Sequence, residues 1–517
     1  MRLPKQPAGL WPALLCGVTV ILQNGCGSSA DNRDRPRLAK QGDAEGRSDK
    51  KSADVQAGRK QPRQLGRDLP VKDAWQQAAD RSQDDANKPA NEAVRGELDR
   101  APLQVDFINP KLLQAAGLRL IRSKHLVLVT DLPPSADVDS LPAAFDKAVP
   151  LWAQYFGVGD KVWRAFRMEG HLMKEQAAFR KIGLFPADLP RFKNGYTMGA
   201  EFWINEQEAA YYRRHLMLHE GVHGFMLAVY GGFGPPWYME GMAELLATHK
   251  LEDGQLVLPY YPRDKQEVPL LGRIRIVQDA VAARKGMRLR QILDYPPRAH
   301  LQSNEPYGWS WAATCFLDSH PRYRERFRNL IDNISDKDFN QSLREAFAGD
   351  WRQLSEEWLI FMMGIEHGYD FQRTAVVYAD GRPLPTDGHR VKIAADRAWQ
   401  SSGVQLQAGK TYRLRANGRY QIAEQPAGRI WWCEPGGVTI RYYKGHPLGK
   451  LLAAVRADRP GDSDSITSLI APAPIGLEAV IQPEQTGTLY LRINDSGAEL
   501  TDNAGKLDVL VTLADEL

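Results

Sequence analysis

The sequence predicts an α+β domain followed by an all-β domain, and three observations support this division. Strand-like segments come first, between residues 118 and 205, and helical patterns then dominate to about residue 368. From about residue 372, short stretches with period-two alternation follow one another, separated by Gly, Pro, Asn and Asp. Strands before helices are typical of α+β domains, and short alternating strands are typical of a β-sandwich or jelly roll. The 517 residues are enough for two or three domains with separate cores.

The composition is that of a globular protein, since 43% of the residues are apolar and 25% are charged. The formal net charge is only +4, and the Lys and Arg residues are scattered along the chain. Nucleic-acid-binding domains usually gather basic residues into a patch or stripe. The sequence therefore predicts no nucleic-acid partner.

Residues 1–26 are predicted to be a signal peptide. Two basic residues precede an apolar stretch, Leu10 to Leu22, which is too short for a comfortable transmembrane helix. Cys26 stands where a bacterial lipoprotein would be cleaved and lipidated, but Gln23 replaces the branched apolar residue expected three positions earlier. A lipid anchor on Cys26, plain secretion and a retained anchor all stay open. The predicted location is the cell envelope or the extracellular space.

Residues 27–100 are predicted to form a disordered polar linker. They are dense in Asp, Arg, Lys, Gln and Ala, and such a segment buries too little apolar surface to offset its ordering entropy. Beyond the signal and the linker, only Cys315 and Cys433 remain as cysteines. They stand in apolar settings in different predicted domains, so two buried free thiols are predicted rather than a disulfide.

The first folded domain is predicted to span residues 101–371. Its predicted strands and helices alternate along the first half of the domain. The strands are 118–122, 125–130, 164–168 and 199–204, and the helices are 142–156, about 208–230 and one that starts near 237. Residues 199–205 have two interpretations: an edge strand that pairs with an extended peptide, or a core strand.

A metal-binding pattern lies in the middle of the helix predicted over 208–230. His219 and His223 are four residues apart, so their imidazoles project from nearly the same face and can reach one tetrahedral zinc. Glu220 is rotated about 100° from His219, where it can act as general base toward a zinc-bound water. The apolar neighbours predict a buried helix, in which unpaired imidazoles would be costly without a metal.

The next predicted helix supplies acidic residues in the segment Trp237-Tyr-Met-Glu240-Gly-Met-Ala-Glu244. Together the two motifs resemble those of the gluzincins, zinc peptidases with a zincin-like α+β fold. The resemblance implies that Glu240 completes the zinc site with His219 and His223, and that Glu244 hydrogen-bonds a zinc-binding imidazole. Sixteen residues separate His223 from Glu240, fewer than in the best-known gluzincins, so Glu244 is the alternative ligand.

Peptide hydrolysis also needs a donor to the developing oxyanion. Gluzincins often supply a Tyr or His from a later helix, and the resemblance implies this catalytic role for Tyr307. Tyr238 and Tyr260 are alternative candidates for this donor. The other interpretation of Tyr307 is an ordinary core or surface aromatic residue. His215 is predicted to be a packed or capping residue rather than a ligand, and His171 has no partner at metal-ligand spacing.

The predicted domain over residues 372–517 carries a second resemblance. The strand ending in Asn494-Asp495 and the later Asp502-Asn503-Ala-Gly resemble the PA-I-type galactophilic lectins, which are calcium-dependent jelly-roll sandwiches of bacteria. The resemblance implies that Asp495, Asp502 and Asn503 bind Ca²⁺, which would coordinate a glycan. Ordinary polar turns are the alternative. Trp431 and Trp432 are predicted to lie in the core, with stacking on a sugar as the alternative.

These patterns predict an exported zinc peptidase that cleaves a protein or peptide substrate and carries a carbohydrate- or surface-binding module. The alternative is a non-catalytic cell-surface carbohydrate-binding protein on a zincin-like scaffold. An intact Glu220 beside the metal ligands favours the enzyme, because a scaffold without activity needs no base there. Zn²⁺ is the predicted cofactor, with Ca²⁺ as a second ion in the C-terminal domain.

Overall fold

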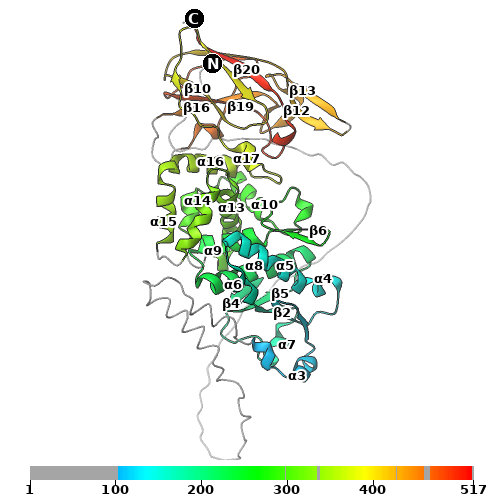
Figure 1. The fold of residues 1–517 in the computed structure, drawn as a ribbon. Coiled ribbons are helices and arrows are strands. Elements are labelled where there is room, and N and C mark those ends of the chain that lie inside the picture. The colour runs from blue at the N-terminus through cyan, green and yellow to red at the C-terminus, as the bar shows by residue number, and fades with distance from the viewer. Residues whose placement is uncertain (1–102, 297–298, 335–337, 427, 459–465, 515–517) are drawn as a thin grey trace, which may run out of the picture.

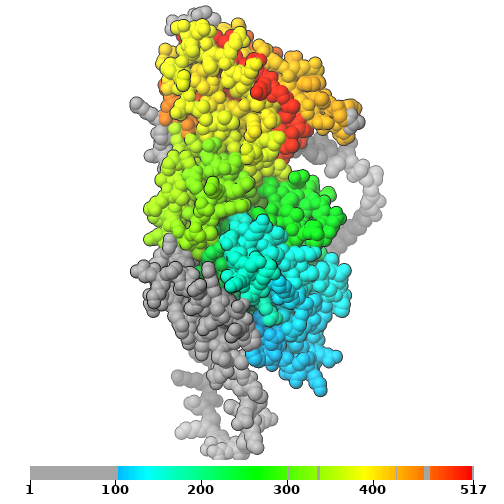
Figure 2. Space-filling model, viewed as in Figure 1, coloured from blue at the N-terminus to red at the C-terminus, as the bar shows by residue number. Residues whose placement is uncertain are grey.

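The computed structural model describes residues 103–296, 299–334, 338–426, 428–458 and 466–514. The predicted signal peptide, Cys26 and the polar linker lie outside the described residues. The described part is elongated: a mixed sheet lies at one end, helices occupy the middle and strands form the other end (Figure 1). In Figure 2 the yellow to red residues form one end of the surface, and the blue to green residues form the other.

The N-terminal sheet has five strands in the order β1-β2-β3-β5-β4. Strands β2, β3 and β5 run parallel, while β1 and β4 are antiparallel to their neighbours. The strands are β1 (Arg119–Arg122), β2 (Leu126–Thr130), β3 (Met168–Met173), β4 (Gly195–Met198) and β5 (Glu201–Asn205).

Helices or turns cover both faces of this sheet. On one face, Phe202 and Ile204 of β5 join the large core with α5 (Leu141–Phe156) and α8 (Ala210–Tyr230). On the other face, Trp203 packs in a smaller core that includes residues of α3 (Pro110–Ala115) and α7 (Gln176–Lys181). This alternation follows from the period-two geometry of a strand.

The predicted strand at 164–168 is wrong. Residues Asp160–Ala165 form helix α6, and the strand β3 follows at Met168–Met173. The Asp160 carboxylate accepts hydrogen bonds from Trp163 and Arg164 within the first helical turn, which favours the helix. All six residues of β3 are buried, so this central strand lacks the apolar and polar alternation of a half-exposed one.

The interpretation of residues 199–205 as an edge strand is also wrong. Strand β5 lies between β3 and β4, and β4 is the edge. The reason is a tight hairpin: Gly199 has a φ of 63°, a left-handed conformation that favours glycine, and it turns β4 directly onto β5.

The middle of the molecule is helical, with one small hairpin of β6 (Lys250–Glu252) and β7 (Gln255–Val257). Helices α9 and α13 pack closely because residue 241 is glycine. A Cβ atom there would lie 2.7 Å from the carbonyl oxygen of Ser310. The α-helices of this part and of the preceding segment are α4 (Ala136–Asp139), α9 (Pro236–Ala247), α10 (Arg273–Ala282), α11 (Leu289–Leu293), α12 (Ala299–Gln302), α13 (Glu305–Ser319), α14 (Arg324–Asn329), α15 (Phe339–Ala346), α16 (Trp351–Gly364) and α17 (Phe371–Thr374).

The C-terminal part is built from strands. One sheet has the order β17-β16-β19-β10-β8, and the other has the order β18-β11-β20-β9. Leu491 of the first sheet and Leu414 and Val509 of the second belong to one buried cluster, so the two sheets share a core. The strands are β8 (Arg382–Pro383), β9 (His389–Ala394), β10 (Gln400–Leu406), β11 (Tyr412–Asn417), β12 (Tyr420–Gln425), β13 (Arg429–Cys433), β14 (Val438–Tyr443), β15 (His446–Leu448), β16 (Leu451–Ala457), β17 (Ala473–Pro474), β18 (Glu478–Ile481), β19 (Gly487–Ile493) and β20 (Lys506–Leu513).

Helix α16 joins the helical part to the strands. Glu356 accepts a hydrogen bond from Arg456 of β16 over 2.7 Å, and both side chains are largely buried. Beyond the end of α16, Glu366 accepts another from Ser496 over 2.6 Å. The predicted domain limit at residue 371 falls inside α17, and the domain limits stay predictions.

The structure has mixed α and β content with several sheets. Cys315 and Cys433 are both buried and free, which confirms the prediction made for these two residues. Within the described ranges, no helix is both long enough and apolar enough to cross a membrane.

Candidate metal centre

Two consecutive helices bring the predicted zinc ligands together. Helix α8 carries His219 and His223 and ends at Tyr230. Gly231 follows with a φ of 70°, the left-handed cap that reverses the chain. A short turn follows, and α9 begins at Pro236, a residue suited to a first helical position. This compact connection places Glu240 in the first turns of α9 beside the two imidazoles.

Three ligand atoms form a nearly regular triangle. Nε2 of His219 lies 3.2 Å from Nε2 of His223 and 3.2 Å from Oε2 of Glu240. Nε2 of His223 lies 3.5 Å from the same oxygen. Ligand atoms at about 2.0–2.1 Å from a tetrahedral zinc lie about 3.3 Å from one another. The residues therefore fit a tetrahedral ion with one position left for water or substrate.

The same three atoms do not satisfy one another while both rings are neutral. Glu240 Oε2 is buried and has no well-aligned hydrogen-bond donor. Two imidazole nitrogens facing each other can form only one hydrogen bond, in which one nitrogen donates and the other accepts. A buried carboxylate and two imidazoles gathered in this way are expensive unless an ion compensates them. The exposed fractions of His219, His223 and Glu240 are 4–8%, so the cluster retains a small opening to solvent.

The electrostatics of the cluster favour a positive charge. Burial alone would lower the pKa of His219, but the carboxylates of Glu240 and Glu244 raise it to about 10. Burial likewise opposes ionisation of Glu240, yet the two imidazoles hold its pKa well below its usual range. The acidic groups of the site thus stay ionised and favour a bound cation. A divalent metal ion would provide that positive charge.

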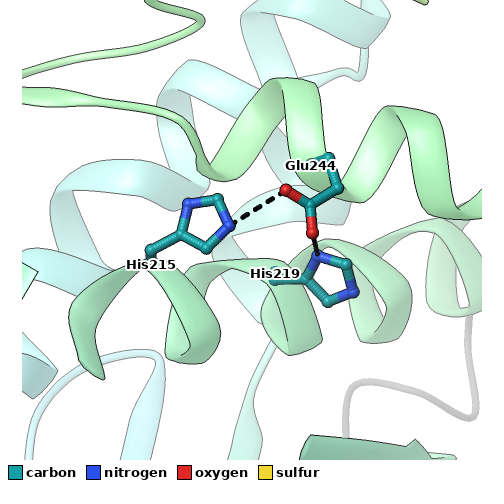
Figure 3. Close-up of side chains that lie close together, drawn as sticks. All are labelled: His215, His219 and Glu244. Carbon is teal, nitrogen blue, oxygen red and sulfur yellow. Dashed lines mark hydrogen bonds and ion pairs between the residues drawn. The ribbon is translucent and has the colours of Figure 1, made fainter. Parts of the chain in front are cut away.

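Glu244 lies one turn after Glu240 on α9. Its carboxylate faces the imidazoles of His215 and His219 (Figure 3). Its Oε1 is 3.4 Å from Nδ1 of His219, and its Oε2 is 3.2 Å from Nε2 of His215. Arg273 of α10 donates to both oxygens of Glu244, over 2.8 Å and 2.5 Å. Glu244 is fully buried, and the guanidinium already neutralises it.

This network distinguishes the two candidate acidic ligands. His215, His219 and Glu244 could also hold an ion by distance alone. The Arg273 guanidinium would then stand beside the ion, which Coulomb repulsion disfavours. Glu240 has no such partner, so its carboxylate is the better placed ligand. His215 is packed in the interior, as predicted from its sequence context, with Nδ1 also bonded to the carbonyl of Ala247.

Glu220 is held by the edge strand of the sheet. Thr197 of β4 donates its hydroxyl to Glu220 Oε2 over 2.6 Å. A Cβ atom at Gly195 would lie 2.3 Å from Glu220 Oε1, so the absence of a side chain there makes room for the carboxylate. Burial raises the pKa of Glu220, while His219, His223 and Thr197 oppose the rise. These features suit a general base near the metal ligands.

Of the three tyrosines considered from the sequence, Tyr307 lies beside the metal ligands. Its ring centroid is 6.1 Å from that of His219. Burial and the nearby carboxylates raise its pKa well above the usual range, so the hydroxyl stays protonated and able to donate. Tyr238 is instead fully buried against Trp237, and Tyr260 donates to Glu267.

The loop after β19 brings together two of the three predicted calcium ligands. Asn503 donates to Asp495 Oδ2 over 2.8 Å, and burial raises the pKa of Asp495 to about 6. Oδ1 of Asp502 and Oδ1 of Asn503 are both buried without a hydrogen-bond donor. Glu499 is neutralised by Arg441, whose Nη2 lies 2.6 Å away. Oxygens without donors would be satisfied by a hard cation.

The expectation that Trp431 and Trp432 both lie in the core is wrong for Trp432. Nearly half of its surface, 48%, is exposed, whereas Trp431 is partly buried. Both residues lie on β13, which pairs with β12 in a two-stranded hairpin outside the two main sheets. Successive residues of such a strand point to opposite faces, so one indole turns inward and the next turns outward.

Two residues at the site were not found by reasoning from sequence. Thr197 and Arg273 reach Glu220 and Glu244 from a strand and a helix outside the motif. Neither stands at a fixed spacing from the histidines, so no local signal marks them. The buried acidic pair in α9 could have indicated that a basic partner was needed, but not which one.

Comparisons with known proteins yield only remote similarity. No protein-family model matches the chain, and no curated protein matches it. Among solved structures, the chain is similar to the EclA N-terminal domain, a PllA-like lectin, at 21% identity and a TM-score of 0.19. That match covers 24% of this chain and 96% of the lectin domain.

A second similarity is to the IMPa metallopeptidase from Pseudomonas aeruginosa. The identity is 11% and the TM-score 0.16, with 86% of this chain and 54% of that chain covered. IMPa in complex with an O-glycopeptide matches at 10% identity and a TM-score of 0.13, covering 86% and 55%. This chain therefore spans about half the length of IMPa. TM-scores this low do not establish a shared fold, and no family assignment follows.

Proposed function

We propose that this protein is an exported zinc peptidase of the gluzincin type, with a zincin-like catalytic domain. One observation carries the proposal: Nε2 of His219, Nε2 of His223 and Oε2 of Glu240 stand 3.2–3.5 Å apart, close to the edges of a zinc tetrahedron. Glu244 and Arg273 fix the first imidazole from behind, as the partners of metal-ligating histidines do.

Zinc bound by these three residues would polarise the scissile carbonyl and acidify a water molecule. Glu220 is placed to accept the proton of the attacking water and to pass it to the leaving amine. Thr197 keeps one oxygen of Glu220 fixed, which leaves the other to exchange the proton. The Tyr307 hydroxyl, protonated in its acidic surroundings, would donate to the developing oxyanion.

The edge strand suggests how a peptide would bind. Strand β4 pairs only with β5 among the described strands, so its other edge could pair with an extended chain. Thr197 of the same strand touches the proposed general base. A peptide added to β4 would therefore run past Glu220, and its backbone hydrogen bonds would supply affinity without demanding one sequence.

The C-terminal part is proposed to be a jelly-roll, lectin-like module that holds Ca²⁺ with Asp495, Asp502 and Asn503. The oxygens of Asp502 and Asn503 that lack donors support the ion site. The exposed indole of Trp432 offers an apolar ring for a sugar face. Such a module would bring the peptidase to a glycan-bearing protein or to a cell surface.

The activity is tested with purified full-length chain and a library of fluorogenic peptides. Cleavage should disappear after chelation and return with one equivalent of zinc, and Glu220→Gln should lower kcat by at least about a thousandfold with zinc still bound. Glu325→Gln, the same change at an exposed position of α14, is the matched control and should cleave normally. Equal cleavage by Glu220→Gln and wild type would refute the mechanism.

A further inference from the structure

A second cluster of potential ligands lies on the N-terminal sheet, on the face opposite to α8. Glu169 and His171 are two residues apart on β3 and point to the same face. In the parallel pair of β3 and β5, Glu169 stands opposite Glu201, and His171 stands opposite Trp203. Trp203 belongs to the smaller core on this face, whereas α8 packs in the core of the other face.

The side chains converge on the imidazole. Nε2 of His171 lies 3.5 Å from Oε1 of Glu169 and 3.6 Å from Oε2 of Glu201. These distances are close to the edge of a tetrahedral zinc site, about 3.3 Å. All three ligand atoms lie within 4.8 Å of one another. The imidazole is held in place because it stacks on Trp203 at a centroid distance of 5.2 Å.

These polar atoms have no hydrogen-bond partners. Both ring nitrogens of His171, Oε1 of Glu169 and Oε2 of Glu201 are buried and unsatisfied. His171 and Glu169 are fully buried, and the other oxygen of Glu169 accepts from the backbone of Val105 over 2.8 Å. Among the residues that the structure describes, neither Lys nor Arg forms an ion pair with Glu169 or Glu201. A cation placed among the buried Glu169, the partly exposed Glu201 and the imidazole of His171 would give these atoms a partner.

We propose that Glu169, His171 and Glu201 bind a second divalent metal ion, separate from the zinc of the α8–α9 site. One imidazole and two carboxylates are a ligand set suited to Zn²⁺ and similar transition ions rather than to Ca²⁺ or Mg²⁺, which take oxygen ligands. Three protein ligands leave a fourth position, and the side chain of Glu201 is 25% exposed, which provides a route for the ion and a water.

The position indicates a structural role. The ion would join β3 to β5, the strand that carries the hairpin partner β4. Because Thr197 of β4 contacts Glu220, the ion would stabilise the strand pair that supports the proposed base from the far side of the sheet. It needs no part in the chemistry, and the inference does not depend on the proposed peptidase activity.

The test counts zinc in the full-length chain. Metal is removed with a chelator, Zn²⁺ is added back, and bound zinc is measured per chain by mass spectrometry after gel filtration. Wild type should bind two zinc ions, and Glu240→Gln and His171→Gln should each bind one. The double variant should bind none. Glu201→Gln changes the partly exposed ligand of the cluster and should also lose one ion. This variant replaces His171→Gln in the test if His171→Gln fails to fold.

The outcomes separate this inference from the proposed function. A single zinc that disappears with Glu240→Gln and persists in both His171→Gln and Glu201→Gln would overturn the second site. A single zinc that persists in Glu240→Gln and disappears with Glu201→Gln would support the second site and contradict the proposed catalytic centre. Circular dichroism of each variant establishes that a loss of zinc is not a loss of fold.

Discussion

At the scale of single residues, the site depends on groups that never touch the proposed ion. Glu244 is fully buried and is bonded by Arg273, His215 and His219 together. Glu220 is fixed by one hydroxyl from a strand. Such neighbours hold a metal ligand within reach of the ion and a general base within reach of the attacking water. A small displacement of either group would lower activity.

The hydroxyl of Thr197 should be needed to keep Glu220 ionised and oriented. Its hydrogen bond favours the charged form and so lowers the pKa of Glu220 against the rise caused by burial. Thr197→Val should raise that pKa, move the acidic limb of the pH–activity profile to higher pH and lower kcat by about tenfold or more. Thr197→Ser should restore both, measured as kcat from pH 5 to 9. An unchanged profile for Thr197→Val would contradict this role.

Arg273 should be needed for folding as much as for the site. Arg273→Met would leave the carboxylate of Glu244 buried without its main cationic partner, and breaking such a pair costs about 3–5 kcal/mol. Thermal unfolding of the metal-free protein should show a marked fall in Tm. The double variant Arg273→Met with Glu244→Gln should recover part of the loss, because no unpaired charge remains. Equal Tm values for the single variant and wild type would contradict the account.

At the scale of elements, the motif residues are explained by how α8, α9 and α13 pack. Gly241 allows α13 to approach α9, and Thr314 of α13 donates to the carbonyl of Gly241 over 2.9 Å. Tyr307 stands in the first turn of α13, so this close contact also sets its distance from His219. The glycine between the two acidic residues is therefore a packing requirement.

Gly241→Ala should be destabilising although alanine is the better helix former. The added Cβ would lie 2.4 Å from Thr314 Cγ2 as well as 2.7 Å from the Ser310 carbonyl oxygen. Overpacking of this kind costs about 1–3 kcal/mol, against a gain of about 1 kcal/mol in helix propensity. Tm measurements should show a net fall, whereas Gly349→Ala, where a Cβ meets nothing within 4 Å, should not. A rise in Tm for Gly241→Ala would contradict this packing.

The elements that sequence reasoning placed well have strong periodicity. The helix ending at Tyr230 and the helix beginning near Trp237 are close to their predicted limits. The failures have physical causes. Strand β3 hides Glu169 and His171 inside a fully buried segment, and the edge position of β4 depends on the fold of the whole sheet. Contacts made across strands, such as those of Thr197 and His171, cannot be deduced from spacing along one chain segment.

At the scale of the whole molecule, the helical part and the strands meet through polar and apolar contacts. Val376, Trp399, Leu452 and Tyr490 form a small buried cluster, with Ile360 of α16 packed against it. Ser496, the residue after Asp495, donates a hydrogen bond to Glu366 beyond the end of α16. The proposed calcium loop therefore lies against the helical part. Binding of an ion there would stabilise the loop next to this junction.

Calcium should reverse the effect of removing the Asp495 charge. The folded-state pKa of Asp495, about 6, lies above its ordinary value of 3.8, so ionisation opposes folding as the pH rises through this range. Without calcium, Asp495→Asn should therefore match wild type near pH 4 and be more stable by about 3 kcal/mol at pH 7. With calcium at pH 7 wild type should be the more stable. Denaturant unfolding with and without the ion tests this, and no response to calcium would remove the ion site.

The most direct test of the central claim is a crystal structure with anomalous data on both sides of the zinc absorption edge. A zinc peak is expected about 2 Å from Nε2 of His219, Nε2 of His223 and Oε2 of Glu240. Arg273 should stay bonded to Glu244 behind the ion. A zinc-loaded crystal with no peak at these three atoms, or with the peak on Glu244 and His215 instead, would contradict the claim.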